Sequence, residues 1–276
     1  MRSIKLGEAL LFCPGDRPDR FLKAVQRADR AILDLEDAVG PARKAHARQE
    51  VITALPALDE RTIVRINATG TPWQDDDIAA LRQLRRETAT SPLLMLPKAV
   101  NSEQLAALED FDVIALCETA EGVLSAAQIA AAPNCVALFW GGEDLIADLG
   151  GRHSRDASGH YYPLVEQARS SVLLAAAARG IPAIDAVHID ITDYAGLKRE
   201  AKQAVDLGFR AKACIHPSHL AVIREAFRPS DDEYQWARDV VEALKKAQNG
   251  VVSLNGRMID DPLLKQAQMI LGMEQA

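Results

Sequence analysis

The chain has 276 residues, of which 48% are hydrophobic and 26% are charged, so it can bury a large core. Its formal net charge is −7 at pH 7, which excludes a broad basic surface for nucleic acid or for an anionic membrane. It contains no apolar run of the ~18 residues needed to span a bilayer, and the N-terminal apolar run is too short for a signal peptide. The cysteines have no C-x-x-C spacing and lie mostly in apolar runs, which favours reduced thiols and a cytoplasmic location; they are Cys13, Cys117, Cys135 and Cys214.

Eight short apolar runs alternate along the chain with helical patterns such as the Pro-initiated one over Pro18–Arg27. The runs are Leu10–Pro14, Ala31–Asp37, Thr62–Asn67, Leu93–Lys98, Asp112–Leu116, Val136–Trp140, Ile184–Asp190 and Ala211–Pro217. Such runs predict buried parallel strands, and eight in succession favour an α/β fold closed as a (β/α)8 TIM barrel over an open doubly wound sheet. We predict a catalytic barrel domain over 1–228 and a C-terminal helical extension over 229–276.

Two acidic turns stand at the ends of neighbouring predicted strands. Cys117-Glu118-Thr119 follows the fifth run, and Gly141-Gly142-Glu143-Asp144 follows the sixth. Consecutive parallel strands end side by side, so we expect Glu118 and Asp144 to be neighbours. Carboxylates without an accompanying His or Cys are ligands suited to Mg²⁺, which keeps several waters that a substrate can displace.

Barrel enzymes build their sites on the loops that follow the strands, so the polar residues at these ends form one predicted constellation. It comprises Asp16, Arg17, Glu36, Asp37, Arg65, Asn67, Lys98, Glu118, Asp144, Asp190 and His216. The mixture of carboxylates and cations indicates a site for a metal and an anionic substrate. The seventh run places His188 and Asp190 on one face of its strand.

Several segments, taken in order, resemble one family. They are Phe12-Cys13-Pro14-Gly15-Asp16-Arg17-Pro18, Ile32–Val39 with Lys44 and Arg48, Val64-Arg65-Ile66-Asn67, Met95-Leu96-Pro97-Lys98, Glu118-Thr119-Ala120, Trp140–Leu145, His216-Pro217 and Met258-Ile259-Asp260. Together they are similar to the citrate lyase β-subunit-like acyl-CoA lyases of the HpcH/HpaI aldolase superfamily, which include citramalyl-CoA and malyl-CoA lyases. The match covers essentially the whole chain.

The resemblance implies a role for each matching residue. Glu118 and Asp144 would bind Mg²⁺ directly, with Glu36 and Asp37 holding metal-bound waters. Arg65 would contact the substrate oxygens, and its guanidinium can stabilise developing negative charge. Asp260 would come from the tail of a neighbouring subunit, in a homotrimer, to transfer a proton at the enolate carbon.

Substrate contacts are expected from a second group of residues. The amides around Gly141 and Gly142, where no side chain blocks approach, are expected to bind the keto acid carboxylate. Arg17, Lys44 or Arg48 would hold the phosphates of coenzyme A.

The activity implied is Mg²⁺-dependent cleavage, or formation, of a β-hydroxyacyl-CoA such as citramalyl-, malyl- or citryl-CoA. The products are acetyl-CoA and a 2-keto acid. Two alternatives stay open: a citrate lyase β subunit that works only with partner subunits, and an aldolase acting on free hydroxy acids through the metal or through a Schiff base at Lys98.

Each site residue also has a structural interpretation. Glu118 and Asp144 would pair with Lys or Arg at the strand ends, Arg65 would form a buried ion pair, and Asp260 would cap the last helix. Lys98 is interpreted as an ion-pair partner of Glu36 or Asp37 rather than a nucleophile. Lys44 and Arg48, four apart on a helix, are typical of a solvated face, and His188 and His216 are expected to be structural.

Overall fold

The computed structural model describes residues 4–246 and 251–272. The predicted extension over 229–276 also includes 247–250 and 273–276, which lie outside the described residues. The chain divides into two compact units, the first ending at Ala226 and the second beginning at Phe227. Among the described helices, none is long and apolar enough to cross a membrane.

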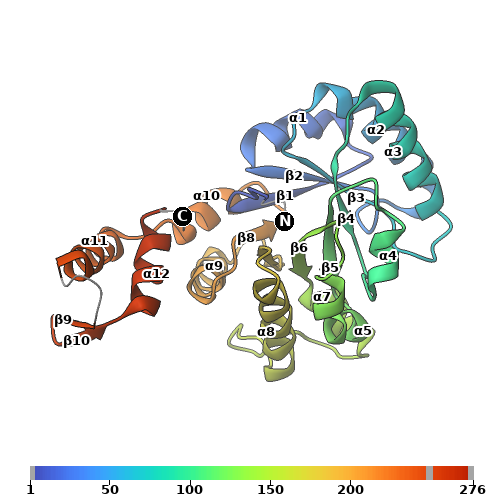
Figure 1. The fold of residues 1–276 in the computed structure, drawn as a ribbon. Helices are drawn as coiled ribbons and strands as arrows, with labels where there is room; N and C mark the ends of the chain where they lie inside the picture. Colours follow the sequence, from blue (N-terminus) through green and yellow to red (C-terminus); the bar gives the residue numbers. More distant parts are fainter. Residues whose placement is uncertain (1–3, 247–250, 273–276) are drawn as a thin grey trace. The chain divides into compact units, whose positions relative to one another are not determined.

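The first unit is a closed barrel of parallel strands in the order β1 to β8, which confirms the predicted (β/α)8 TIM barrel (Figure 1). The barrel closes where β1 pairs with β8, with Leu11 opposite Cys214. The strands are β1 (Ala9–Pro14), β2 (Arg30–Asp34), β3 (Thr62–Arg65), β4 (Leu93–Leu96), β5 (Val113–Cys117), β6 (Cys135–Trp140), β7 (Ala183–Asp185) and β8 (Ala211–Cys214).

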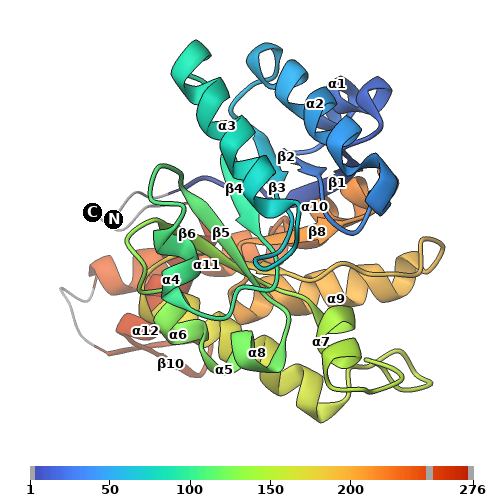
Figure 2. The ribbon, with the colours of Figure 1, turned by 90° about the vertical axis from the view of Figure 1, so that its right-hand side faces the viewer.

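Helices follow the strands and lie outside the barrel wall (Figure 2). They are α1 (Pro18–Arg27), α2 (Lys44–Ala54), α3 (Gln74–Thr88), α4 (Ser102–Ala106), α5 (Ala120–Leu124), α6 (Ala126–Ile129), α7 (Gly142–Asp148), α8 (Pro163–Ala178), α9 (Tyr194–Leu207) and α10 (His219–Phe227). Short 3₁₀ helices, η1 (Pro41–Arg43) and η2 (Leu55–Ala57), flank α2. Asn101 caps α4, since its side-chain oxygen accepts the N–H of Gln104 at 3.0 Å.

Apolar side chains from successive strands fill the barrel interior. Ile32, Ile63, Met95 and Ile114, from β2 to β5, are fully buried in one cluster. Every residue of β3 to β8 is buried, because the helices cover the outer face of the strands while the interior is packed with side chains. The packed wall gives a fixed frame for the residues at the strand ends.

Five strands, β2, β3, β4, β7 and β8, end earlier than the apolar runs predict. β2 stops at Asp34 because its carboxylate accepts the N–H groups of Glu36 at 2.9 Å and Ala38 at 3.2 Å, and these local bonds replace the strand ladder. β7 stops at Asp185, and β8 stops at Cys214. The predicted runs to Asp37, Asp190 and Pro217 therefore include the first residues of the following loops.

The prediction that His188 and Asp190 share one strand face was wrong. His188 is buried, whereas Asp190 is exposed in the loop after β7. The Asp190 carboxylate accepts the backbone N–H of Thr192 at 2.9 Å, which closes a local turn in place of a strand.

The four cysteines are buried and unpaired, as predicted. Burial disfavours the thiolate, and it raises the pKa of Cys13 to about 11. The thiols of the barrel are therefore held in an unreactive, protonated form.

The second unit contains α11 (Asp231–Lys246), β9 (Val252–Leu254), β10 (Arg257–Ile259) and α12 (Asp261–Ile270). Asn255-Gly256 forms the turn that joins antiparallel β9 and β10, and both residues have positive φ, 49° and 76°. The buried cluster of this unit comprises Ala237, Val240, Leu244, Ile259 and Ala267.

Candidate active site

A cavity of about 240 Å³ opens at the C-terminal ends of the barrel strands. Six residues predicted for the site line it, namely Asp37, Arg65, Glu118, Gly141, Gly142 and Asp144. The other lining residues are Phe12, Asp34, Ala38, Leu116, Phe139, Trp140, Glu143, Ala186, Val187 and Ile215. The barrel thus gathers into one cavity side chains from loops that are far apart in the sequence.

Glu118 is a buried carboxylate that lines the same cavity as Asp144. It follows β5 directly, is 2% exposed, and accepts the backbone N–H of Lys98 at 3.1 Å. It packs against Gly141, where an added Cβ would lie 2.8 Å from Glu118 Oε2, so a larger residue would displace the carboxylate. Burial, and then the negative charge of Asp144 in the first turn of α7, raise the pKa of Glu118 well above its ordinary value.

Arg65 is a fixed cation in the cavity wall. Its Nε and Nη2 donate to the two carboxylate oxygens of Asp34 at 2.7 and 2.6 Å, and its Nη1 lies 2.9 Å from Glu36 Oε2. The guanidinium carbon lies 4.9 Å from the centre of the Phe12 ring. Burial opposes the charge, but Asp34 and Glu36 outweigh it and raise the pKa of Arg65. The buried ion pair is confirmed, and Arg65 also faces the cavity.

Lys98 joins the acidic residues of two loops. Its Nζ donates to Glu36 and lies 3.5 Å from Asp37 Oδ2 and 3.9 Å from Asp144 Oδ1. Burial opposes its charge, but the hydrogen bond and charge of Glu36 raise the pKa of Lys98. The predicted ion-pair role is confirmed, and a protonated amine is not a nucleophile.

The donors fit a Mg²⁺ ion. A carboxylate as buried as Glu118 is favoured in its charged form only by a close cation, and Arg65 is already engaged by Asp34 and Glu36. In the described ranges, no group of three or more His, Cys, Asp or Glu side chains makes a complete protein cage for a metal. Mg²⁺ instead binds through one or two carboxylates and keeps water or substrate as its remaining ligands. Glu118 and Asp144, beside one open cavity, meet that requirement.

Lys44 and Arg48 do not lie on a solvated face, and this expectation was wrong. Lys44 is 6% exposed, and its Nζ donates to the carbonyls of Leu35 and Glu36, both at 2.7 Å, and to Asn67 Oδ1 at 2.6 Å. Arg48 Nε donates to the buried Asp77 at 2.7 Å. Lys44 is bonded to oxygens at the ends of β2 and β3, and Arg48 pairs with Asp77 on α3, so neither has the exposed donors that a coenzyme A phosphate requires.

Arg17 lies outside the central cavity, in a neighbouring one of about 560 Å³. This second cavity is lined by the basic side chains of Arg17, Arg20 and Lys23 on or next to α1, and it shares Phe12 and Ile215 with the central cavity. Arg17 itself pairs with Asp19 at 3.1 Å. The two cavities are adjacent, because Phe12 and Ile215 line both of them.

The other predicted rim residues have local partners. Asp16 pairs with Arg43 at 3.0 Å, and His216 Nδ1 lies 2.8 Å from Ser218 Oγ. Asn67 donates through Nδ2 to Asp77 at 2.6 Å. These contacts are structural, as expected for His216.

Asp260, in the second unit, occupies the N-cap position of α12, and its side chain makes no capping hydrogen bond. The alternative that it caps the helix is therefore not supported by a contact.

Sequence reasoning missed Asp34 and Phe12 as site residues. Asp34 clamps Arg65 through both oxygens, and Phe12 supports the guanidinium from one side. Phe12 lies in β1 and Asp34 ends β2, so both belong to predicted strands. Their shared partner, Arg65, ends β3, and an apolar pattern does not show which residues of different strands meet.

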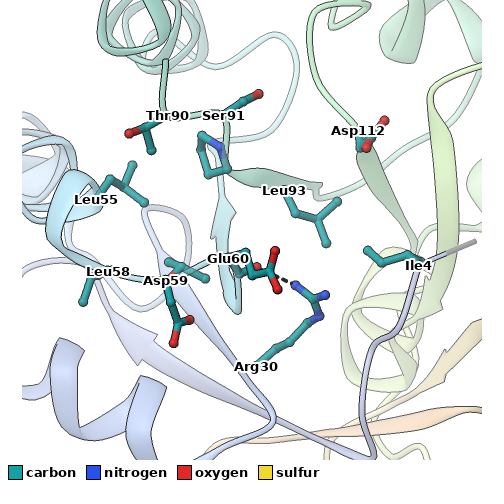
Figure 3. A pocket seen from close by; sticks show the side chains of 12 residues that line it. Ile4, Arg30, Leu55, Leu58, Asp59, Glu60, Thr90, Ser91, Leu93 and Asp112 are labelled. Atoms are coloured by element: carbon teal, nitrogen blue, oxygen red, sulfur yellow. Dashed lines mark hydrogen bonds between the residues drawn. The ribbon is translucent and has the colours of Figure 1, made fainter. Parts of the chain in front are cut away.

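A third cavity, of about 360 Å³, lies at the opposite end of the barrel (Figure 3). Figure 3 shows Arg30 beside Glu60, and the guanidinium donates to backbone carbonyls of Lys5 and Glu60. Thr62 and Leu93, at the beginnings of β3 and β4, line this cavity. Barrel enzymes rarely place chemistry at this end, so the cavity belongs to the structural side of the fold.

The closed barrel and the charged cavity at its C-terminal end define a TIM-barrel enzyme whose acidic loops suit a divalent metal and an anionic substrate. The chain belongs to the HpcH/HpaI aldolase/citrate lyase family, whose model matches residues 8–217. The predicted family, and its class as a lyase enzyme, are confirmed.

Three characterised relatives span most of the chain. A citrate lyase subunit beta-like protein of Mycobacterium tuberculosis is 48% identical over 96% of this chain and 94% of its own length. The human mitochondrial citramalyl-CoA lyase is 32% identical, covering 94% of this chain and 83% of the relative. A (3S)-malyl-CoA thioesterase of Cereibacter sphaeroides is 34% identical over 97% of this chain and 94% of its own length.

Solved structures of similar chains contain small ligands. CitE of M. tuberculosis in complex with magnesium, acetoacetate and coenzyme A has a TM-score of 0.90 and 47% identity, over 97% of both chains. The citrate lyase beta subunit of M. tuberculosis with oxaloacetate and magnesium has a TM-score of 0.76 and 50% identity, over 81% of this chain and 97% of the other. Homologous proteins therefore bind magnesium together with a keto acid or with coenzyme A.

Proposed function

We propose that this chain is a Mg²⁺-dependent carbon–carbon lyase that cleaves or forms a β-hydroxyacyl-CoA such as citramalyl-, malyl- or citryl-CoA. Its products would be acetyl-CoA and pyruvate, glyoxylate or oxaloacetate. The observation that carries this proposal is the buried Glu118 carboxylate, which faces Asp144 and a cavity walled by the fixed cation Arg65. The magnesium, keto acid and coenzyme A bound by related structures support it.

Glu118 and Asp144 would hold the metal, and Glu36 and Asp37 would orient its water ligands. When bound, Mg²⁺ lowers the pKa of a coordinated hydroxyl and orients the substrate carboxylate beside it. Glu36 is held in place by Arg65 and by Lys98, so its carboxylate is oriented before the substrate arrives.

Cleavage sends the electron pair of the carbon–carbon bond into the thioester fragment, while the hydroxyl loses its proton and becomes the keto carbonyl. The thioester fragment leaves as the enolate of acetyl-CoA and gains a proton at carbon. Arg65 stays protonated throughout and stabilises the developing negative charge from a position fixed by Asp34. The peptide N–H groups around Gly142 would bind the keto acid carboxylate.

Asp260 would deliver the proton to the enolate carbon from a neighbouring subunit, and the assembly would be a homotrimer. The extension over 229–276 would then pack on that neighbour. Two features of the second unit support this role: Asp260 is only partly exposed, and its carboxylate is not used to cap α12.

The coenzyme A moiety would lie along α1. Arg17, Arg20 and Lys23 line the cavity that adjoins the acidic site, and their cationic side chains can pair with phosphate groups. Lys44 would not bind a phosphate of coenzyme A, because its ammonium is buried and bonded to three oxygens. It instead fixes the loop that carries Glu36.

A substrate screen tests the proposal. The purified protein is incubated alone with citryl-CoA, malyl-CoA or citramalyl-CoA, with Mg²⁺ or with a chelator, and acetyl-CoA and keto acid are measured. We expect Mg²⁺-dependent release of both products from at least one thioester. A folded protein that binds Mg²⁺ and keto acid but cleaves none of them would favour a partner-dependent citrate lyase β subunit or an aldolase on free hydroxy acids.

Thioester hydrolysis is a second candidate, because a malyl-CoA thioesterase is 34% identical to this chain. The same screen separates the two reactions by their products. A lyase forms glyoxylate and acetyl-CoA from malyl-CoA, whereas a thioesterase forms malate and free coenzyme A.

A cytoplasmic location belongs to the same proposal. The four buried, unpaired cysteines support it, since reducing compartments keep thiols in this form.

A further inference from the structure

The segment between α7 and α8 carries a nearly buried arginine, Arg155, next to the acidic turn. The Arg155 side chain is 12% exposed, and its Nη1 donates to Glu143 Oε1 at 2.7 Å. Ser154 Oγ donates to the same Glu143 oxygen at 2.6 Å. Glu143 immediately precedes Asp144 and lines the central cavity. The segment therefore contacts Glu143, the residue that precedes the proposed metal ligand Asp144.

The other side of Arg155 is anchored in the barrel. Its Nε donates to Glu200 Oε1 on α9 at 2.8 Å, and Glu200 is 4% exposed. The second oxygen of Glu200 lies 3.1 Å from His188 Nδ1 and 3.4 Å from Lys212 Nζ on β8. Because these partners sit on packed elements, Arg155 connects the acidic turn to a rigid part of the fold.

Aromatic contacts fix the strand end from which the turn departs. The Arg155 guanidinium lies 4.1 Å from the centre of the Tyr161 ring, and Tyr161 meets Trp140 edge-on at 5.3 Å. Trp140, the last residue of β6, donates from Nε1 to Asp185 at 2.8 Å. Trp140, which precedes Gly141-Gly142, is fixed by Asp185 and Tyr161, and Glu143, which follows the glycines, is fixed by Ser154 and Arg155.

We propose that Arg155 is a positioning residue, which sets the place of the Asp144 carboxylate through its contact with Glu143. The inference rests on the metal site proposed above, because Asp144 is there a Mg²⁺ ligand. Glu143 and Asp144 are adjacent residues in the first turn of α7, so a contact that fixes the Glu143 side chain also restrains the backbone that carries Asp144. The charge-assisted bond from Arg155, oriented by Glu200 and Tyr161, supplies that restraint.

The test measures Mg²⁺ affinity by calorimetric titration, which needs no turnover. Arg155→Met should weaken Mg²⁺ binding about tenfold, as is usual when an outer partner of a metal site is lost. Arg155→Lys keeps the charge but cannot reach Glu143, Glu200 and Tyr161 together, so we expect a loss of the same order. Glu143→Ala removes the other end of the contact, leaves Arg155 bonded to Glu200 and stacked on Tyr161, and should also weaken Mg²⁺ binding.

A double-mutant cycle assigns the effect to the contact. If Arg155 acts through Glu143, the double variant should bind Mg²⁺ no more weakly than Arg155→Met alone. Additive losses, or unchanged affinity in Glu143→Ala, would overturn the proposal. Glu143→Ala also keeps the test decisive if Arg155→Met does not fold.

A destabilised control variant separates a positioning role for Arg155 from a general loss of stability. Leu81→Ala opens a cavity in α3, far from this segment in the sequence, and should lower thermal stability while Mg²⁺ affinity stays as in the wild type. Equal loss of affinity in Leu81→Ala would also refute positioning. A wild type that binds no Mg²⁺ at all refutes the metal assignment itself, which is a different result from wild-type binding that Arg155→Met leaves intact.

Discussion

Asp34→Asn should break the fixed geometry of Arg65. In the native protein, both Asp34 oxygens accept from Arg65, at 2.7 and 2.6 Å, and Asp34 is 1% exposed. The substituted amide has nearly the same shape, but one acceptor becomes an NH₂ donor that faces the guanidinium. Arg65 then keeps only Glu36 as a charged partner.

The size of the effect follows from burial. Removing one partner of a buried ion pair costs about 3–5 kcal/mol, because the remaining charge stays desolvated. Since Glu36 still neutralises part of the Arg65 charge, we expect about 3 kcal/mol. For a protein of this size, that corresponds to a fall in Tm of roughly 6–12 °C. A displaced guanidinium should also reduce kcat/KM about 100-fold.

Calorimetric unfolding and steady-state kinetics measure the two effects. Asp59→Asn is the control on the surface, since Arg61 donates through Nε and Nη2 to one oxygen of Asp59, with both side chains 44% exposed. It should leave Tm and activity nearly unchanged. A Tm within about 2 °C of the wild type for Asp34→Asn, with normal kcat/KM, would refute the role assigned to this pair.

Four further predictions concern the ligands, the second unit, the charge network and the thiols. Glu118→Gln and Asp144→Asn should abolish Mg²⁺-dependent turnover while circular dichroism stays native; normal turnover in either variant contradicts the metal assignment. Asp260→Ala should still bind Mg²⁺ and keto acid but exchange the acetyl-CoA methyl protons more slowly, and an unchanged exchange rate measured by NMR would make Asp260 structural. In Glu200, burial opposes ionisation, but His188 and the neighbouring cations lower the pKa below the ordinary 4.5. The ionised Glu200 carboxylate therefore stabilises the fold fully above about pH 4.5 and progressively less as the pH falls. The Tm difference between wild type and Glu200→Gln should narrow in acid. A Tm difference that does not change with pH argues against this ion network. Native protein at pH 8 should show slow thiol labelling by iodoacetamide until it is unfolded, and fast labelling of the folded protein would contradict burial of the four cysteines.

The barrel could be predicted from the sequence because the same strand, turn and helix pattern recurs eight times. The helix over Pro18–Arg27 depends on local chemistry, a proline at its first position, so its predicted limits were correct. The end of β2 depends on the direction of the Asp34 side chain, whose carboxylate accepts N–H groups of the following backbone. The turn at Asp190 depends in the same way on its own carboxylate, which accepts the N–H of Thr192. That choice of rotamer is not visible in an apolar pattern.

The sequence predicted those site residues whose place at or just after the end of a barrel strand determines where they lie in the fold. Glu118, Asp144 and Arg65 follow or end barrel strands, and all three line one cavity. Lys44 and Arg155 were not predictable in the same way, because their acceptors come from distant segments. A lysine on a helix is typical of a solvated surface, and only the fold reveals that Lys44 reaches Asn67 in the loop that follows β3.

The most direct test of the central proposal is a crystal structure of the protein grown with Mn²⁺ and pyruvate, using the anomalous signal to locate the metal. We predict one metal peak bonded to carboxylate oxygens of both Glu118 and Asp144, with pyruvate completing its coordination beside Arg65. A peak elsewhere in the protein, or pyruvate bound without metal between these two carboxylates, would contradict the assignment of this cavity as the site of a metal-dependent lyase.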